Sequence, residues 1–166
     1  TSAKVLSNGC PDISGTYGND GVSAPSESMH FQIDRPNLSI QICGNYSERP
    51  ECLSGERYII IHQPTEDELT FQPISAEGDG QRLGGISSFK LGKDYRCAGG
   101  KVIFSKTRKY LGEMSDYNIV TDETEVSKLL NGDLFLTFRH IQSGIMLVFV
   151  GRTVEEAKMR FPLLAK

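Results

Sequence analysis

The sequence predicts an all-β domain in which an antiparallel meander forms a barrel or sandwich, with one short C-terminal helix. Segments that alternate apolar and polar residues recur about every ten residues, with turn signals between them. Asn131-Gly132 stands between two apolar runs, which is the strongest short-range hairpin signal because both turn residues accept positive φ. With 166 residues, the chain suffices for one domain that buries roughly 70% of its unfolded surface.

Three neighbouring strands are expected around this turn. One strand precedes Asn131-Gly132. After it, Leu134, Leu136 and Phe138 alternate with Phe135, Thr137 and Arg139. A second turn is expected at Gln142-Ser143-Gly144, before the apolar run Ile145–Val150, which reads as a strand buried on both faces. Asp122–Leu130 could instead be a helix with Asn131-Gly132 as its C-cap. The alternation that resumes directly after Asp133 favours the strand.

The remainder of the chain divides into a short arm and further strands. Thr1–Gly9 is small and polar and is expected to be an N-terminal tether, which leaves residues 10–166 as a single domain. Ala76–Gly85 contains four glycines and is expected to be a mobile loop. The other strands are expected at Met29–Ile33, Leu38–Ile42, Arg57–His62, Leu69–Pro73, Ser87–Leu91, Lys101–Ser105 and Tyr117–Thr121.

A helix is expected near the C-terminus. Thr153-Val154-Glu155-Glu156 fits a capping box, in which a threonine oxygen and a glutamate satisfy free backbone N–H groups. The helix is expected to run to about Phe161 and to stop before Pro162, because the residue before a proline disfavours helical geometry. Val154, Ala157 and Phe161 would then share one face.

Four cysteines, Cys10, Cys43, Cys52 and Cys97, allow three pairings. Cys43 and Cys52 flank a polar, turn-rich loop, and their spacing is unusual for a zinc site. Cys10 and Cys97 are far apart in sequence, as a bridge from the N-terminus to the domain would be. The alternative is four reduced cysteines in the cytosol. We expect two disulfides, Cys43–Cys52 and Cys10–Cys97, and therefore an oxidising compartment.

The segment Cys10-Pro11-Asp12-Ile13-Ser14-Gly15-Thr16-Tyr17 resembles the opening of many small bacterial cell-envelope lipoproteins. This resemblance implies a mature domain on the periplasmic side, whose first strand begins in the Gly-Thr-Tyr stretch. A lipidation signal has an apolar residue three positions before its cysteine, whereas Ser7 stands there in this chain. We therefore expect any membrane tether to use a lipidated cysteine upstream of Thr1.

The motifs of several common enzyme classes are missing from the sequence. It contains no G-x-S-x-G elbow, P-loop lysine, zincin pair or EF-hand ladder. His30, His62 and His140 lie on three different predicted strands without metal-ligand spacing, so no metal or cofactor is expected. The net charge of −3 argues against nucleic acid as a partner, because phosphate-binding proteins present a basic face.

Glu66-Asp67-Glu68 is expected to form an acidic hairpin tip. It is either a solvated turn or a contact for a protein partner with a basic surface, where clustered carboxylates speed association.

Three classes of function remain open. The first is a non-enzymatic cell-envelope protein that binds a protein partner, such as an inhibitor or immunity lipoprotein that neutralises a toxin or hydrolase in the periplasm. The second is a lipocalin-like carrier, whose barrel would hold a small apolar ligand among Phe135, Phe138, Ile60 and Phe89. The third is an enzyme with a non-local active site, for which the sequence nominates no residues.

Overall fold

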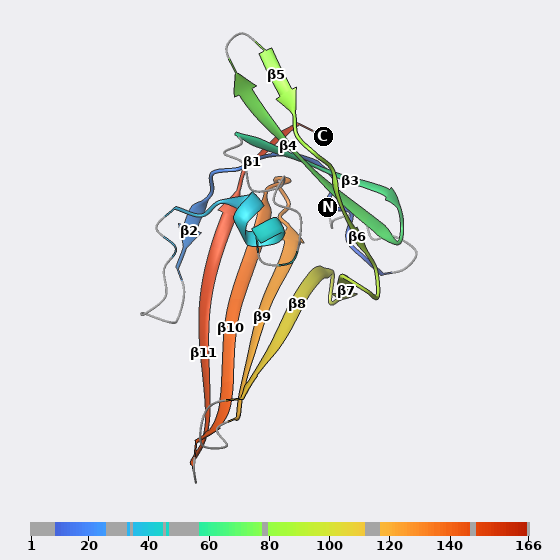
Figure 1. Ribbon diagram of the computed structural model, residues 1–166. Coiled ribbons are helices and arrows are strands. Elements are labelled where there is room, and N and C mark those ends of the chain that lie inside the picture. Colours follow the sequence, from blue (N-terminus) through green and yellow to red (C-terminus); the bar gives the residue numbers. More distant parts are fainter. Residues whose placement is uncertain are drawn as a thin grey trace.

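The computed structural model describes residues 9–25, 33, 35–44, 46, 57–77, 80–111, 117–146 and 149–165. These residues form two antiparallel sheets around one hydrophobic core (Figure 1). The strands of the first sheet are β1 (Gly15–Gly18), β3 (Tyr58–Thr65), β4 (Glu68–Glu77), β5 (Gly80–Leu83), β6 (Ser87–Lys90) and β12 (Leu163–Ala165). Those of the second sheet are β2 (Val22–Ala24), β7 (Tyr95–Ala98), β8 (Lys101–Leu111), β9 (Tyr117–Lys128), β10 (Leu134–Met146) and β11 (Phe149–Phe161).

The two sheets have separate strand orders. The first sheet has the order β12-β1-β3-β4-β5, with β6 paired to β4, and the second has the order β2-β11-β10-β9-β8-β7. The predicted all-β sandwich is therefore confirmed. The closed, lipocalin-like barrel is wrong, because the described strands form two separate sheets, neither of which closes on itself. The chain crosses between the sheets at Pro162, whose carbonyl accepts a hydrogen bond of 3.0 Å from the Gly18 N–H.

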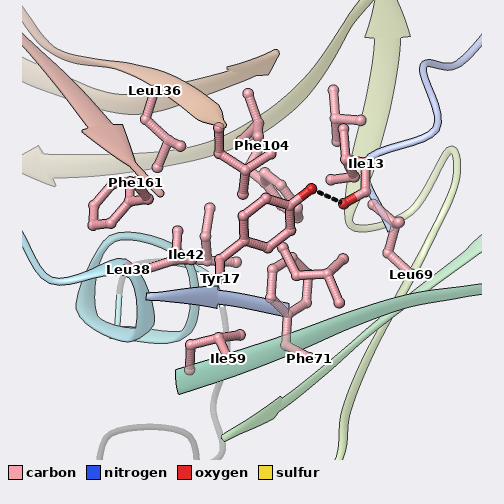
Figure 2. Packing of buried hydrophobic residues seen from close by; sticks show 14 of the residues in the cluster. Ile13, Tyr17, Leu38, Ile42, Ile59, Leu69, Phe71, Phe104, Leu136 and Phe161 are labelled. Atoms are coloured by element: carbon pink, nitrogen blue, oxygen red, sulfur yellow. Dashed lines mark hydrogen bonds between the residues drawn. The ribbon is translucent and has the colours of Figure 1, made fainter. Parts of the chain in front are cut away.

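Tyr17 of β1 lies at the centre of the core and is completely buried. Figure 2 shows its ring between side chains of both sheets, and its hydroxyl donates a hydrogen bond of 2.9 Å to the Ile13 carbonyl. Burial raises the pKa of this hydroxyl far above its ordinary value, so Tyr17 stays neutral. Phe71 and Phe104, one from each sheet, pack edge to face with ring centroids 6.3 Å apart. The aromatic side chains therefore join the two sheets.

The strand predicted at Leu38–Ile42 is wrong, because this segment is helical. Leu38 and Ser39 lead into the π-helix η1 (Ile40–Gly44). Ile40 and Gly44 are exposed, whereas the three residues between them are buried, so exposure repeats every four residues rather than every two. The Asn37 side chain accepts a hydrogen bond of 3.1 Å from the Ile40 N–H. The buried side chain of Asn19 accepts a second one, of 2.8 Å, from the Ser39 N–H. These two amide side chains satisfy the N-terminal donors of the helix.

The predicted C-terminal helix is also wrong, because Thr153–Phe161 belongs to β11. Ala157, Met159 and Phe161 are buried on alternate positions, which is the period of a strand. They lie opposite Phe138, Leu136 and Leu134 of β10 and fill the core from the second sheet. Pairing with the buried residues of β10 therefore favours a strand at Thr153–Phe161, although the local capping-box pattern favours a helix.

The hairpin predicted at Asn131-Gly132 is confirmed between β9 and β10, with Gly132 at a φ of +95°. The second turn, at Gln142-Ser143-Gly144, is wrong because these residues lie inside β10. The run Ile145–Val150 is not one buried strand, since β10 ends within it at Met146 and β11 begins within it at Phe149.

The strands predicted in the first sheet are confirmed, as are the strands at Lys101–Ser105 and Tyr117–Thr121, which are longer than expected. The loop predicted at Ala76–Gly85 is wrong, because β4 pairs with β5 within this segment. The strand predicted at Met29–Ile33, apart from Ile33, and the tether, apart from Gly9, lie outside the described residues.

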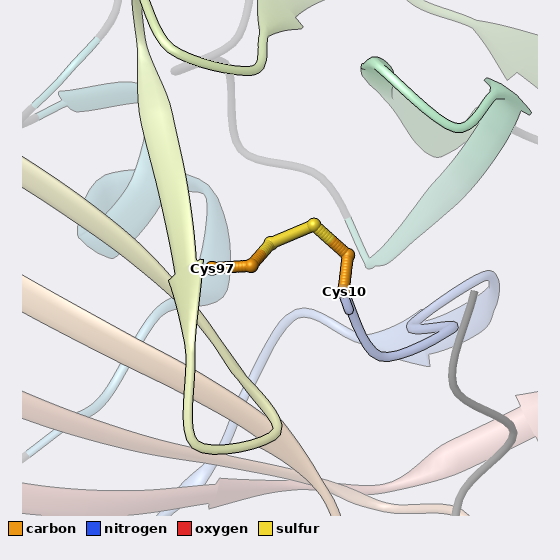
Figure 3. Close-up of a disulfide and its surroundings, with 2 residues drawn as sticks. All are labelled: Cys10 and Cys97. Carbon is orange, nitrogen blue, oxygen red and sulfur yellow. A yellow bond between two sulfur atoms is a disulfide. The ribbon is translucent and has the colours of Figure 1, made fainter. Parts of the chain in front are cut away.

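The predicted disulfide Cys10–Cys97 is confirmed, with an S–S distance of 2.03 Å and a Cα–Cα distance of 5.2 Å. It connects the segment before β1 with β7 and so joins the two sheets covalently (Figure 3). Cys43 is also disulfide-bonded. Its predicted partner, Cys52, lies outside the described residues.

Asp133, at the end of the β9–β10 turn, binds the segment around Pro162, where the chain passes from the second sheet to the first. Its carboxylate accepts a hydrogen bond of 2.9 Å from the Leu163 N–H of β12 and one of 2.6 Å from Arg160 Nε of β11. Burial by itself would raise the pKa of this carboxyl, but these donors and the Asn131 amide outweigh it and lower the pKa. The carboxylate therefore stabilises the fold in its charged form.

Replacing Cys10 and Cys97 together by alanine should lower the free energy of unfolding by about 4–5 kcal/mol, because the bridge closes a long loop in the unfolded chain. The two residues are separated by 87 positions. Urea unfolding followed by circular dichroism measures the change. An unchanged transition midpoint would contradict the prediction.

Asp133→Asn should lower the free energy of unfolding by about 1–2 kcal/mol at neutral pH, because it removes a charged acceptor. Since the folded-state pKa of Asp133 lies below its unfolded value of about 3.9, the stabilisation is present above about pH 4 and is lost as the pH falls through the folded-state pKa. Unfolding curves of the wild type and the variant should therefore converge in acid. A difference that stays constant with pH would refute this role.

Candidate interaction surface

The four longest strands, β8 to β11, continue beyond the hydrophobic core. The last core row across them consists of Phe104, Thr124, Phe138 and Ala157, all of which are buried. On the same face, the next row is Lys106, Asp122, His140 and Glu155. From this point the four strands extend away from the first sheet (Figure 1).

We call this extension the projecting sheet and define it as residues 105–111, 117–123, 139–146 and 149–156. It extends for roughly 20 Å at about 3.4 Å per residue. None of its residues is buried, wherever the structure describes their exposure. Threonine and β-branched residues favour strand geometry along it, and the Thr107 and Thr121 hydroxyls are hydrogen-bonded across the strands at 3.0 Å.

A cluster of ion pairs lies at the base of the projecting sheet, on the face that points away from the core. Arg139 donates hydrogen bonds of 2.6 Å to Glu125 and 2.8 Å to Glu156, and it lies 3.4 Å from Glu123. Hydrogen bonding to Glu125 is the main cause of a raised pKa for Arg139. Lys101 lies 2.6 Å from the same Glu125.

Burial alone would raise the pKa of Glu125, but Lys101 and Arg139 outweigh it and lower the pKa. On the opposite face, Asp122 Oδ1 lies 2.6 Å from His140 Nδ1, and its second oxygen lies 3.9 Å from Arg108. Ion pairs therefore connect the four strands where hydrophobic packing ends.

The projecting sheet has two edges without a strand partner among the described residues. On one side, β2 pairs with Lys158–Arg160, and no other described strand pairs with the outer edge of β11 at residues 149–157. On the other side, β7 pairs with 101–104 of β8, and residues 105–111 have no outer strand neighbour in the described part of the chain. The backbone groups along such edges can pair with another strand.

The acidic tip Glu66-Asp67-Glu68 lies at the β3–β4 turn, as predicted. Glu66 and Asp67 are exposed, and the Asp67 carbonyl accepts a hydrogen bond of 2.9 Å from the Leu91 N–H. Glu68 lies opposite Lys90 in the strand register. The pKa of Tyr95 is raised to about 12, first by burial and then by the charges of Asp67 and Glu68. This tip belongs to the first sheet, and its partner-binding role stays a prediction.

The four residues proposed to line a ligand cavity do not share one surface. Phe89 and Phe138 are buried in the core. Ile60 lies between the buried residues Ile59 and Ile61, so its side chain points to the other face of the sheet. Phe135 lies on the outer face of its sheet for the same reason.

The described residues contain no group of three or more histidine, cysteine or acidic side chains that could hold a metal ion. His62 is exposed on β3 and His140 is paired with Asp122, while His30 lies outside the described residues. Among the described residues, no helix has the length and hydropathy needed to cross a lipid bilayer.

The chain matches no protein-family model, no curated protein and no solved structure. The candidate surface therefore rests on its own geometry. Sequence reasoning did not find the projecting sheet, because it divided β9, β10 and β11 into shorter pieces. The signal was the alternation over Leu134–Arg139, which marks the start of a strand that continues without a break to Met146 in β10.

Arg139→Met should lower the free energy of unfolding by about 1–3 kcal/mol, because three carboxylates lose their shared cation. Lys158→Met is the matched control, since the only ion pair of Lys158 among the described residues is with Glu156, at 3.4 Å. This control should change stability by less than about 1 kcal/mol. Chemical denaturation measures both changes, and equal effects would show that the cluster does not stabilise the projecting sheet.

Proposed function

We propose that this chain is a non-enzymatic cell-envelope protein that binds a protein partner with a basic surface. An inhibitor or immunity protein acting on a toxin or hydrolase in the periplasm is one form of this function. The disulfide Cys10–Cys97 supports an oxidising compartment. The observation that carries the proposal is the edge of β11 at residues 149–157, which has no strand partner among the described residues and lies next to a position where a strand is already paired.

The short strand β2 shows that this edge accepts an antiparallel strand. Val22 and Ala24 lie opposite Arg160 and Lys158. Beyond Lys158 the same edge continues without a strand partner among the described residues, so a segment of another protein can extend the pairing from that point. Strand addition of this kind gives affinity through backbone hydrogen bonds and specificity through side chains.

The two open edges differ in charge. The edge of β8 carries Lys106, Arg108 and Lys109, and cations of this kind discourage strand addition. The edge of β11 exposes one cation, Arg152, followed by Thr153, Val154 and Glu155. Glu155 has no ion pair within the described part of the chain, so its carboxylate is available to a basic segment. The β11 edge is therefore the better acceptor of the two.

The acidic tip Glu66-Asp67-Glu68 offers a second contact to the same partner. Exposed carboxylates at the rim of an interface act mainly on the association rate. A partner that uses both contacts should associate more slowly as the salt concentration rises.

The double variant Thr153→Lys with Glu155→Lys should weaken partner binding at least about tenfold, because it adds cations to the edge and removes a carboxylate. The partner is first isolated from envelope extract on the immobilised wild-type protein, then purified and measured by surface plasmon resonance. A second double variant, Glu66→Lys with Glu68→Lys, adds the same cations to the acidic tip on the first sheet. It should slow association and flatten its salt dependence, with little effect on dissociation.

Equal affinity of the wild type and the β11 variant would remove this edge from the interface. Failure to isolate any saturable protein partner, together with tight uptake of an apolar ligand, would favour the carrier function instead.

A further inference from the structure

The far end of the projecting sheet has a graded order of residues. The strand register sorts the side chains into rows across the sheet. From the end inward, the rows are Met146–Phe149, Leu111–Tyr117–Ile145–Val150, Tyr110–Asn118–Gly144–Gly151, Lys109–Ile119–Ser143–Arg152 and Arg108–Val120–Gln142–Thr153. The order therefore runs from apolar residues through tyrosines to cations, which is the order found across a lipid–water interface.

The apolar end is exposed where its side chains are described. Leu111 is 83% exposed and Tyr110 is 48% exposed. Because they are neighbours in β8, their side chains point to opposite faces of the sheet. Apolar surface thus lies on both faces of the end rather than in one flat patch. This arrangement suits immersion in a uniformly apolar medium better than contact with one side of a protein.

Three cations, Lys109, Arg152 and Arg108, lie just behind this end on the two faces of the sheet, and we call them the collar. Lys109 and Arg152 share a row on one face, and Arg108 lies in the next row on the other face. The described residues between the row of Arg108 and the end of the sheet include no carboxylate, although the whole chain has a net charge of −3. Glu113 and Asp116 follow β8 in sequence and lie outside the described residues.

The distance between the collar and the end fits a bilayer surface. Lys109 and Arg152 lie three rows behind Met146 and Phe149, which corresponds to about 10 Å along the strands. Elements that lie in the membrane interface bury their apolar face to a depth of about 5–10 Å. Cations at the collar would then meet the phosphates of the lipid headgroups.

We propose that this end of the projecting sheet docks on an anionic lipid bilayer. Leu111, Tyr110 and Tyr117 enter the boundary between headgroups and acyl chains, and Lys109, Arg152 and Arg108 contact the phosphates. This inference goes beyond the proposed partner binding and does not depend on it, because lipid vesicles contain no protein partner.

The test uses a tryptophan reporter, since the chain contains no tryptophan. Leu111→Trp places one at the end of the projecting sheet. Vesicles of phosphatidylcholine and phosphatidylglycerol should shift its emission to shorter wavelength, and brominated acyl chains should quench it. Leu130→Trp is the matched control, because Leu130 is also 83% exposed but lies at the β9–β10 turn, the opposite end of the same strands. Its emission should stay unchanged.

A charge test accompanies the reporter. Lys109→Gln with Arg152→Gln should weaken binding to the anionic vesicles about 25-fold, at about fivefold per cation. Lys90→Gln with Lys93→Gln removes two exposed cations from the first sheet and its loop and should leave vesicle binding unchanged. Co-sedimentation with vesicles measures both variants.

Emission from Leu111→Trp that does not respond to vesicles would overturn the proposal, as would equal shifts at both reporter positions. If the Leu111 reporter responds to the isolated protein partner but not to vesicles, the end of the sheet is a protein contact and the bilayer proposal is wrong.

Discussion

The hydrophobic core is shorter than the strands that form one side of it. It ends at the row that contains Phe104 and Phe138, while β8 to β11 continue well beyond. Apolar burial is the main favourable term in folding, so the extension requires another source of order. The ion pairs of Arg139 and Asp122 lie directly after the last core row and supply that order. Both surfaces proposed on the projecting sheet depend on this early end of the core.

Strand β11 shows how one element serves different environments along its length. Its C-terminal part, from Ala157 to Phe161, alternates buried and outward-facing residues and closes the core. The middle part, around Thr153–Glu155, is exposed on an open edge. The register with β10 is unbroken throughout, so position along the strand decides which environment a side chain meets. Side chains therefore alternate between the two faces in the same way in the buried part of β11 and in its exposed part.

Local signals predicted the elements whose partners are near in sequence. The β3–β4 hairpin, the turn at Asn131-Gly132 and the position of Glu66-Asp67-Glu68 follow from turn residues and alternation. Two assignments failed in opposite directions, one predicted strand and one predicted helix. Leu38–Ile42 alternates like a strand but is helical, because Asn19 satisfies its backbone from a distant segment. Thr153–Phe161 carries a helix-capping pattern but lies in a strand, because β10 supplies a complementary buried row.

The candidate surface could not be predicted for the same reason, since its exposure depends on where the other sheet stops. An apolar run such as Ile145–Val150 reads as buried unless the covering layer is known, and that layer comes from residues far away in sequence. The disulfide Cys10–Cys97 was predictable, because four cysteines allow few pairings.

The unbroken pairing of β10 with β11 also has a mechanical consequence. Hydrogen-bonded neighbours follow one another from Leu134 and Phe161 in the core to Met146 and Phe149 at the far end. No bulge interrupts this ladder or the one between β9 and β10, so it has no built-in hinge along its length. A force applied at the far end is therefore transmitted along the whole ladder to its other end, where the hydrogen bonds of Asp133 fasten the passage of the chain between the sheets.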